Sequence, residues 1–386
     1  MAHTFDTLKT ETLRQKACNK WQKHPDEVLP LWVADMDFPV ADPIKAALRA
    51  YPSTDNFGYT PPEGLPGFKE AAIERLQIRY GWTVTREQLY PLNGIVTGLF
   101  LGVLSCTTEA EQVIMQSPIY APFMMAVKQT GRAAVYNRLV HDGEHYRIDF
   151  EELETLVTPA TRLFMLCNPQ NPVGRVFTRE ELEKLADFAL RHRLWVVSDE
   201  LHSDLVYPGH EHIPFASLGD EIAQRTITLF GPTKTFNIAG LKTGFLVAQN
   251  EALLAYIKEA AFGLVGPPNV MGQAGAIAAY REGDEWLRET LGYLEQNRNF
   301  VADFVKRELP QVKHTSPEGT YLAWLDFTAL DLDDVETFLR EEAKVALNDG
   351  AWFGPGGEGF ARLNFATAQH IVEEALTRIR DAVQKL

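Results

Sequence analysis

Short apolar runs alternate with amphipathic segments through the middle of the chain. Four runs are bounded by polar or turn-forming residues and indicate buried strands, at residues 112–115, 162–167, 194–198 and 226–230. The segments between them carry apolar residues at helical spacing, and Thr178 with Glu181 forms a capping box at the start of one that reaches Arg191. Strand alternating with helix across residues 89–250 predicts an α/β domain, with a mostly parallel sheet covered by helices on both faces.

Before this block, the pattern predicts two helices. Asp42 is typical of a helix N-cap, and Pro43 at the first helical position favours a helix over residues 42–50. Turn-forming residues fill positions 56–62. Apolar residues at helical spacing then predict a helix over residues 68–80.

After residue 250 the pattern is mainly helical. The core face of one long helix is marked by Leu287, Leu291, Leu294, Val301, Phe304 and Val305. Residues 320–327 alternate like an exposed edge strand, 331–343 predict a helix, 360–365 predict a strand, and the chain ends in a helix. Residues 1–40 and 286–386 flank the α/β block of residues 41–285, so we expect them to form a second, smaller α+β domain.

Charge and cysteine content argue against several kinds of partner and site. The 386-residue chain has a formal net charge of −15, which makes a nucleic acid or an anionic membrane an unfavourable partner. Cys18, Cys106 and Cys167 lie far apart without CxxC spacing, so neither a disulfide framework nor a cysteine zinc site is supported. The longest uncharged apolar run, residues 95–106, is shorter than the roughly 20 residues needed to span a bilayer. With no signal-peptide pattern at the N-terminus, we expect a soluble cytoplasmic protein.

Three polar side chains follow predicted strands. Asn171 lies in the rigid Asn-Pro-Gln-Asn-Pro loop of residues 168–172, which can continue neither helix nor strand. Asp199 directly follows the strand at 194–198, and Lys234 comes four residues after the strand at 226–230. Because ligands of parallel sheets bind beyond the carboxyl ends of the strands, we expect a ligand site there.

Lys234 lies in a turn of small residues. An amine held there and partly desolvated can lose its proton near neutral pH and attack a carbonyl. Taken alone, Lys234 fits a solvated loop lysine better, as most lysines are solvated. The turn at Gly94 leads into a helix and presents free backbone N–H groups suited to a phosphate, although many such turns bind nothing.

Together these residues match what a pyridoxal phosphate site requires. That cofactor needs an amine for its aldehyde, a carboxylate to keep its ring nitrogen protonated, a donor at its ring oxygen and a cradle for its phosphate. Lys234, Asp199 35 residues before it, and the Asn-Pro loop supply the first three. Over nearly its full length the chain resembles the fold-type I, class I/II aminotransferase-like enzymes. Within that group, residues 31–38, 57–59 and 234–241 resemble the MalY/PatB C–S lyases.

The resemblance implies individual roles. Lys234 would bond to the cofactor's aldehyde, Asp199 would pair with its ring nitrogen, and Tyr120 would stack on its ring. Further cofactor contacts are implied for Asn171 and His202 at the ring oxygen, for Gly94, Ile95, Val96, Thr233 and Lys242 at the phosphate, and for Tyr59 at the phosphate of the other subunit of a homodimer. Arg362 would bind the substrate carboxylate in bidentate fashion, with Ala34 and Asn171 beside it. From the residues alone, Arg362 is equally compatible with a surface ion pair, and His202 with a core histidine.

Two positions depart from the family pattern. Gly231 stands where many relatives have a serine that contacts the phosphate, and Lys242 stands where aminotransferases usually have an arginine. Phosphate binding would then rest on Thr233, Lys242 and the turn at Gly94. The histidines of residues 210–212 lack the spacing of a helical zinc motif and follow a Pro-Gly pair, so we predict a solvated turn there.

The implied activity is cleavage of cystathionine or a related S-substituted L-cysteine to a thiol, pyruvate and ammonia. A class I/II aminotransferase would use the same residues, with a 2-oxo acid completing its cycle, so the residues leave these two activities open. Some members of the group are also implicated in transcription-factor control, which makes a regulatory binding role a remoter alternative.

Overall fold

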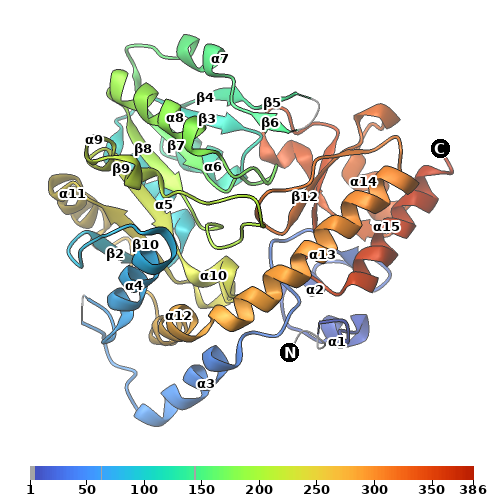
Figure 1. Cartoon of the computed structure of the whole chain (residues 1–386), viewed down its shortest axis with the longest axis horizontal. Coiled ribbons are helices and arrows are strands. Elements are labelled where there is room, and N and C mark those ends of the chain that lie inside the picture. Colours follow the sequence, from blue (N-terminus) through green and yellow to red (C-terminus); the bar gives the residue numbers. More distant parts are fainter. Residues whose placement is uncertain (1–4, 62, 143–144) are drawn as a thin grey trace.

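Two sheets of unequal size organise the chain (Figure 1). The structure, a computed structural model, describes residues 5–61, 63–142 and 145–386. Residues 1–4 of the predicted smaller domain and Pro62 of the predicted turn-rich segment lie outside the described residues. Among the described residues, no helix is both long enough and apolar enough to cross a membrane.

The larger sheet has seven strands. They are β2 (Leu89–Leu92), β3 (Gln112–Ser117), β4 (Ala133–Arg138), β7 (Thr161–Cys167), β8 (Trp195–Asp199), β9 (Thr226–Phe230) and β10 (Gly244–Ala248). Their order is β2-β10-β9-β8-β7-β3-β4, and β10 runs antiparallel to both of its neighbours. The other pairs of neighbours are parallel. The predicted mostly parallel sheet is confirmed, and all strands except β10 end at the same edge.

Alternate residues of the central strands pack into different helix layers. Met165 and Val197 belong to one apolar cluster, with residues of α5, α6 and α11, whereas Phe164 and Val196 belong to another, with residues of α7, α8 and α9. The bounds are α5 (Ile95–Cys106), α6 (Ala121–Gln129), α7 (Phe150–Thr155), α8 (Arg179–Arg191), α9 (Asp220–Ala223) and α11 (Glu251–Ala261). Because strand side chains alternate between faces, helices cover both sides of the sheet, as predicted.

The smaller sheet is antiparallel, in the order β11-β12-β15-β14. Its strands are β11 (Lys313–His314), β12 (Leu322–Asp326), β14 (Asn348–Asp349) and β15 (Phe360–Asn364), and the nearby helices are α14 (Val335–Glu341) and α15 (Gln369–Val383). The N-terminal segment carries α1 (Thr10–Arg14), α2 (Asn19–Gln22) and β1 (Leu29–Pro30), and β1 pairs in parallel with β13 (Val345–Ala346). A short hairpin of β5 (Val140–His141) and β6 (Tyr146–Arg147) completes the strands of the described residues.

One apolar cluster connects the two sheets. It contains Phe230 and Phe245 of the larger sheet together with Leu322 and Leu363 of the smaller one. Helices α3 (Asp42–Ala50), α4 (Phe68–Tyr80), α12 (Val270–Glu282) and α13 (Asp284–Glu308) contribute to it, and short α10 (Pro232–Thr235) lies nearby. In Figure 1, α13 runs from α12 beside the larger sheet to α15 beside the smaller one. The division into residues 41–285 and residues 1–40 with 286–386 stays a prediction.

Three local predictions need correction. Strand β12 was expected at an exposed edge, but it lies inside its sheet with Leu322–Leu325 buried, because Trp324 packs on Phe360 while its neighbours pack into the cluster between the sheets. Helix α14 is shorter than residues 331–343, because Asp334 caps it and accepts a hydrogen bond from Thr337 N. Asp42 is the first helical residue of α3 rather than its N-cap.

Candidate functional site

A cavity of about 810 Å³ lies at the carboxyl edge of the larger sheet. Cys167, Asp199 and Leu229 are register partners across β7, β8 and β9, so the loops that follow these strands leave the sheet side by side. The predicted site residues that line the cavity are Ala34, Gly94, Ile95, Val96, Tyr120, Asn171, Asp199, His202, Thr233, Lys234, Lys242 and Arg362. Tyr59 is the one predicted site residue outside this lining. The expected shared site is therefore present.

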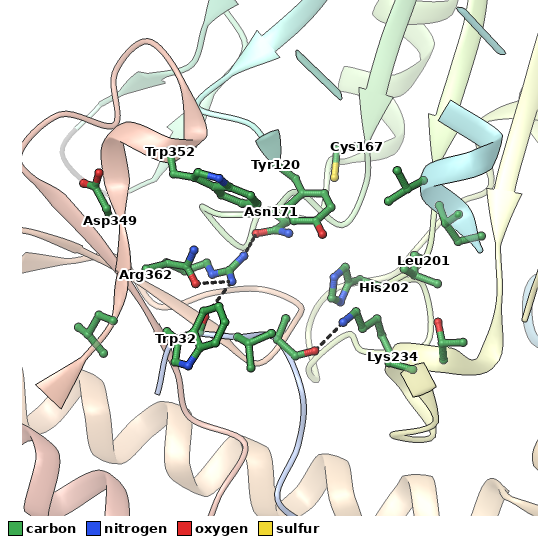
Figure 2. A pocket seen from close by; sticks show the side chains of 18 of the residues that line it. Trp32, Tyr120, Cys167, Asn171, Leu201, His202, Lys234, Asp349, Trp352 and Arg362 are labelled. Atoms are coloured by element: carbon green, nitrogen blue, oxygen red, sulfur yellow. Dashed lines mark hydrogen bonds between the residues drawn. The ribbon is translucent and has the colours of Figure 1, made fainter. Parts of the chain in front are cut away.

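Lys234 projects into the cavity from α10 (Figure 2). Its Nζ donates a hydrogen bond to the carbonyl oxygen of Ala34 at 2.6 Å, and it lies 3.7 Å from Asp35 Oδ1. Burial lowers the pKa of the Lys234 ammonium, and the carboxylate of Asp35 opposes that shift. Lys234 is thus a partly desolvated amine at the base of a cavity, and the alternative of a solvated loop lysine is excluded.

Asp199 is a buried carboxyl group at the end of β8. Its Oδ1 accepts a hydrogen bond from Leu201 N at 3.0 Å. Burial raises the pKa of Asp199 to about 7, against the lowering effect of that hydrogen bond. A carboxyl group in this setting gains most from a cationic N–H donor in the cavity, since burial of an unpaired charge is costly.

Arg362 is held in place by neighbouring acceptors. From β15, its Nη1 donates to Asn171 Oδ1 at 2.9 Å, and its Nη2 donates to the carbonyl oxygen of Trp32 at 3.0 Å and to Asn348 Oδ1 at 3.3 Å (Figure 2). The guanidinium also lies over the ring of Phe353, with its Cζ 4.8 Å from the ring centroid. Burial lowers the pKa of Arg362 to about 10. Arg362 is therefore a buried, oriented cation in the cavity wall, and a surface ion pair is excluded.

The N-terminus of α5 opens into the cavity. Gly94 is its N-cap and supplies no side-chain hydrogen bond to the backbone N–H groups of the first turn. Gly94 has a φ of 152°, a conformation that favours glycine. Free N–H groups and the positive end of the helix dipole at Ile95 and Val96 make an anion-binding corner. Thr233 and Lys242 border the same cavity.

The departure at Gly231 has a packing cause. A Cβ atom at this position would come 3.0 Å from the Cα of Gly244 and 3.1 Å from the carbonyl oxygen of Thr243. Both contacts are backbone atoms of or beside β10, so they cannot move away as a flexible side chain could. The close approach of β10 therefore excludes a serine at position 231 without rearrangement.

His202 and Tyr120 complete the polar lining. His202 is buried, and burial lowers its pKa to about 3, so the ring is neutral at physiological pH. The ring of Tyr120 lies 5.4 Å from that of Trp352 in an edge contact, and burial raises the pKa of its phenol. His202 thus lines the cavity as a buried, neutral ring, and its contact with a cofactor stays a prediction.

Tyr59 lies on the surface and does not line the cavity. Its side chain is fully exposed, and Phe57 beside it is 60% exposed. Two large exposed rings so close together are typical of a surface that another protein covers.

The prediction of a solvated turn at residues 210–212 is wrong for His212. That ring is buried, and its Nε2 lies 3.0 Å from Glu200 Oε2. Glu200 also accepts from the Ser198 hydroxyl at 2.9 Å and from Phe215 N at 2.9 Å. The buried carboxylate after β8 needs these donors, which draws His212 inward. No group of residues able to hold a metal ion is found within the described chain.

Sequence reasoning missed several residues of the site. Trp32, Asn348 and Trp352 line the cavity, and Asp35 lies in ion-pair range of Lys234. Trp32 and Asp35 are part of the segment that carries the family resemblance, which was the available signal for them. Nothing in the spacing marks Asn348 or Trp352, because only the fold brings them to Arg362 and Tyr120.

Comparison with known proteins decides the family. The model of the family described as aminotransferase class I and II matches residues 26–379. The chain belongs to the class I and II aminotransferase family. Cystathionine beta-lyase PatB of Bacillus subtilis is 41% identical over 378 residues, which covers 94% of this chain and 96% of that one.

Solved structures of this family agree with the fold. Cystalysin from Treponema denticola, which contains a pyridoxal 5′-phosphate cofactor, superposes with a TM-score of 0.93 at 32% identity, covering 96% of this chain and 97% of that one. The pyridoxal phosphate-bound C–S lyase from Staphylococcus hominis gives a TM-score of 0.91 at 32% identity, covering 96% of each chain. The fold is thus that of the fold-type I pyridoxal phosphate enzymes.

Proposed function

We propose that this protein is a pyridoxal phosphate-dependent C–S β-lyase that cleaves cystathionine or a related S-substituted L-cysteine to a thiol, pyruvate and ammonia. The observation that carries the proposal is the shared cavity of Lys234 and Asp199, at the ends of neighbouring strands. The cystathionine beta-lyase and C–S lyase relatives support the reaction type.

The donors of the cavity fit the cofactor. His202 Nδ1 is buried and lacks a hydrogen-bond partner among the described residues. The uncapped start of α5 suits the phosphate, and the carboxyl group of Asp199 suits a protonated ring nitrogen. A bound pyridoxal phosphate would satisfy groups that the protein alone leaves without partners, which is the expected property of a cofactor site.

Ten of the lining residues would hold the cofactor in different ways. They are Asn171 and His202 at the ring oxygen, Tyr120 on the ring face, Asp199 at the protonated ring nitrogen, Lys234 as the amine that bonds to the cofactor, and Gly94, Ile95, Val96, Thr233 and Lys242 around the phosphate. When bound, pyridoxal phosphate supplies an aldehyde that condenses with amino groups and a ring that draws electrons from the bonds at the substrate's Cα.

The protein's own groups bind the substrate and move its proton. Arg362 binds the α-carboxylate with its guanidinium, which Asn171 and the carbonyl of Trp32 already orient. The N–H of Ala34 and the amide of Asn171 assist at that carboxylate. Lys234, freed as an amine, takes the Cα proton, because burial keeps its pKa below that of an exposed lysine. Loss of the thiolate from Cβ, with uptake of a proton by its sulfur, gives the thiol and leaves an unsaturated amino acid. Addition of water to that amino acid then releases pyruvate and ammonia.

A class I/II aminotransferase is the second candidate, favoured by the family model that covers most of the chain. The test is to supply cystathionine to the purified protein without any 2-oxo acid and to follow pyruvate and free thiol. We expect sustained release of both. Activity that requires an added 2-oxo acid would reject the lyase in favour of transamination. Lys234→Ala serves as the inactive control.

We further propose that the active form is a homodimer in which Tyr59 reaches the phosphate of the other subunit. The exposed ring pair at Phe57 and Tyr59 supports this arrangement, since neither side chain lines the cavity of its own chain.

The three cysteines are free, in keeping with our expectation of a reducing cytoplasm.

A further inference from the structure

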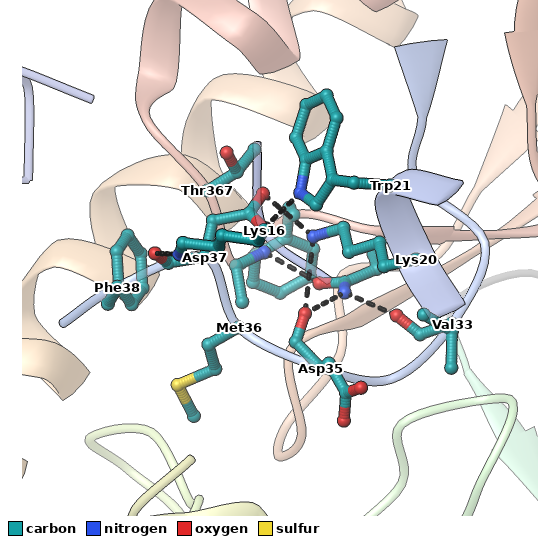
Figure 3. A network of polar contacts seen from close by, with 12 residues as sticks. Lys16, Lys20, Trp21, Val33, Asp35, Met36, Asp37, Phe38 and Thr367 are labelled. Carbon is teal, nitrogen blue, oxygen red and sulfur yellow. Dashed lines mark hydrogen bonds and ion pairs between the residues drawn. The ribbon is translucent and has the colours of Figure 1, made fainter. Parts of the chain in front are cut away.

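A segment without helix or strand, residues 31–38, contributes to the cavity wall, and we call it the strap. A buried ion pair holds it to α2: Lys20 Nζ lies 2.8 Å from Asp37 Oδ2, and both side chains are almost fully buried. Trp21 Nε1 donates to the other oxygen of Asp37 at 2.7 Å, and Lys16 Nζ donates to its carbonyl oxygen at 2.8 Å (Figure 3). The strap is therefore fixed at its C-terminal end, through Asp37.

Two asparagines from other elements also hold the strap. Asn364 on β15 donates its Nδ2 to the carbonyl oxygens of residues 33 and 35, each at 2.7 Å. Asn237, in the loop after α10, donates its Nδ2 to the carbonyl oxygens of residues 36 and 38, at 3.0 and 2.9 Å. The backbone of Asp35 is thus fixed, and Figure 3 shows its carboxylate pointing away from this network.

The carboxylate of Asp35 lies beside Lys234. Its Oδ1 is 3.7 Å from Lys234 Nζ, and that nitrogen also donates to the carbonyl oxygen of Ala34 at 2.6 Å. The hydroxyl of Tyr321 donates to the same carbonyl oxygen at 2.8 Å. Adjacent residues of the strap therefore offer the Lys234 ammonium one carboxylate and one fixed carbonyl oxygen.

The other charged or titratable groups facing Lys234 have other partners in the proposed enzyme. Asp199 is assigned to the cofactor's ring nitrogen and Arg362 to the substrate carboxylate. Burial lowers the pKa of His202 to about 3, so its ring is neutral. Of these groups, Asp35 is the carboxylate that no other role occupies.

We propose that Asp35 is a positioning residue for the base, whose carboxylate holds the protonated form of Lys234 after the amine has taken the Cα proton. An opposite charge at this distance favours the charged form of an amine, so Asp35 raises the basicity that burial alone would reduce. The inference rests on the proposed function, because it takes Lys234 as the base. The contact itself can be measured without any substrate.

The test uses the full-length chain freed of cofactor, in which Lys234 is an unmodified amine. The chain is labelled with a limiting amount of acetic anhydride over a series of pH values, and mass spectrometry of the Lys234 peptide gives the apparent pKa of that side chain. We expect Asp35→Asn to lower this pKa by about one unit and Asp35→Glu to retain most of the wild-type value. Asp303→Asn, which removes an exposed carboxylate of α13, should leave it unchanged.

An Asp35→Asn chain that folds normally and whose Lys234 titrates as in the wild type would overturn the proposal. Asp35→Ser also removes the charge, so either folded variant decides the question. In the loaded enzyme, we expect Asp35→Asn to lower kcat roughly tenfold or more with little change in KM. If Asp35→Asn lowers the pKa of Lys234 but the wild-type protein shows no lyase turnover, the proposed function is refuted and the Asp35 contact stands.

Discussion

Arg362 illustrates how much of this site depends on the orientation of single side chains. Its two terminal nitrogens already donate to Asn171, Asn348 and the carbonyl of Trp32. The planar guanidinium is therefore fixed before any substrate arrives, and Nε is left without a partner among the described residues. Such a fork matches a carboxylate better than a lysine ammonium does.

Arg362→Lys should weaken binding of the substrate carboxylate. We expect kcat/KM to fall by about 30-fold, which corresponds to the roughly 2 kcal/mol of a hydrogen bond to a charged group. Steady-state kinetics with cystathionine measures the change. Arg191→Lys, at an exposed arginine of α8, is the matched control, and equal kinetics for the two variants would argue against carboxylate binding by Arg362.

Asp199 should make the stability of the cofactor-free chain depend on pH. Burial raises its pKa to about 7 in the folded chain, above the value of 3.8 for an unperturbed side chain. The folded chain therefore holds this proton more tightly than the unfolded chain does. The resulting stabilisation of the folded chain is fully present below the unfolded pKa and is lost as pH rises through about 7. Urea unfolding between pH 4 and 8, roughly the span of the two values, should therefore show a decline that Asp199→Asn lacks. If the free energy of unfolding changes with pH in the same way for the wild type and Asp199→Asn, the raised pKa of Asp199 is contradicted.

For single residues, the sequence predicted the site residues that follow strands. It did not predict residues whose position depends on burial in the folded chain. Asn171, Asp199 and Lys234 could be found because each comes after a recognisable apolar run. For Asp35 the family resemblance of its segment was the available signal, because nothing local links it to a lysine 199 residues later. His212 was misassigned because the demand of the buried Glu200 for donors is not visible in a Pro-Gly-His sequence.

The strap is the element on which the geometry around Lys234 depends. It forms neither helix nor strand. Backbone hydrogen bonds of Leu31 and Asp37 fix it, together with side chains from α2, β15 and the loop after α10. The ion pair of Lys20 and Asp37 is buried on both sides. Removal of one partner of such a pair leaves an uncompensated charge.

Asp37→Ala should therefore destabilise the protein strongly, by about 3–5 kcal/mol. Asp26→Ala removes a partner of the exposed pair with Arg14 and should cost at most about 1 kcal/mol. Urea unfolding of the two variants at neutral pH gives the comparison. Equal stabilities would mean that the buried pair does not hold the strap.

Prediction of whole elements succeeded where the local signal was complete. The capping box at Thr178 and the apolar strand runs carry their own boundaries, and α8 and β9 begin and end where predicted. Strand β12 was misplaced at an edge because neighbours far along the chain determine its position. Its pairing with β15 and the stacking of Trp324 on Phe360 are not visible locally.

At the scale of the whole molecule, the proposed homodimer can be tested by complementation. If Tyr59 acts across the interface, a heterodimer of Tyr59→Ala and Lys234→Ala chains has one site with both defects and one with neither. An equal mixture, unfolded and refolded together, should recover about a quarter of wild-type activity, since half the dimers are mixed and half their sites are intact. If Tyr59 acts within its own chain, every mixed site carries a defect and no activity returns.

The account depends most directly on the bond between Lys234 and pyridoxal phosphate. Purified enzyme reduced with borohydride and digested can be searched by mass spectrometry for the lysine that carries the cofactor. We predict the modification on the peptide containing Lys234, and its absence from the Lys234→Ala variant. A reduced cofactor on another lysine, or one retained by the variant, would contradict the account.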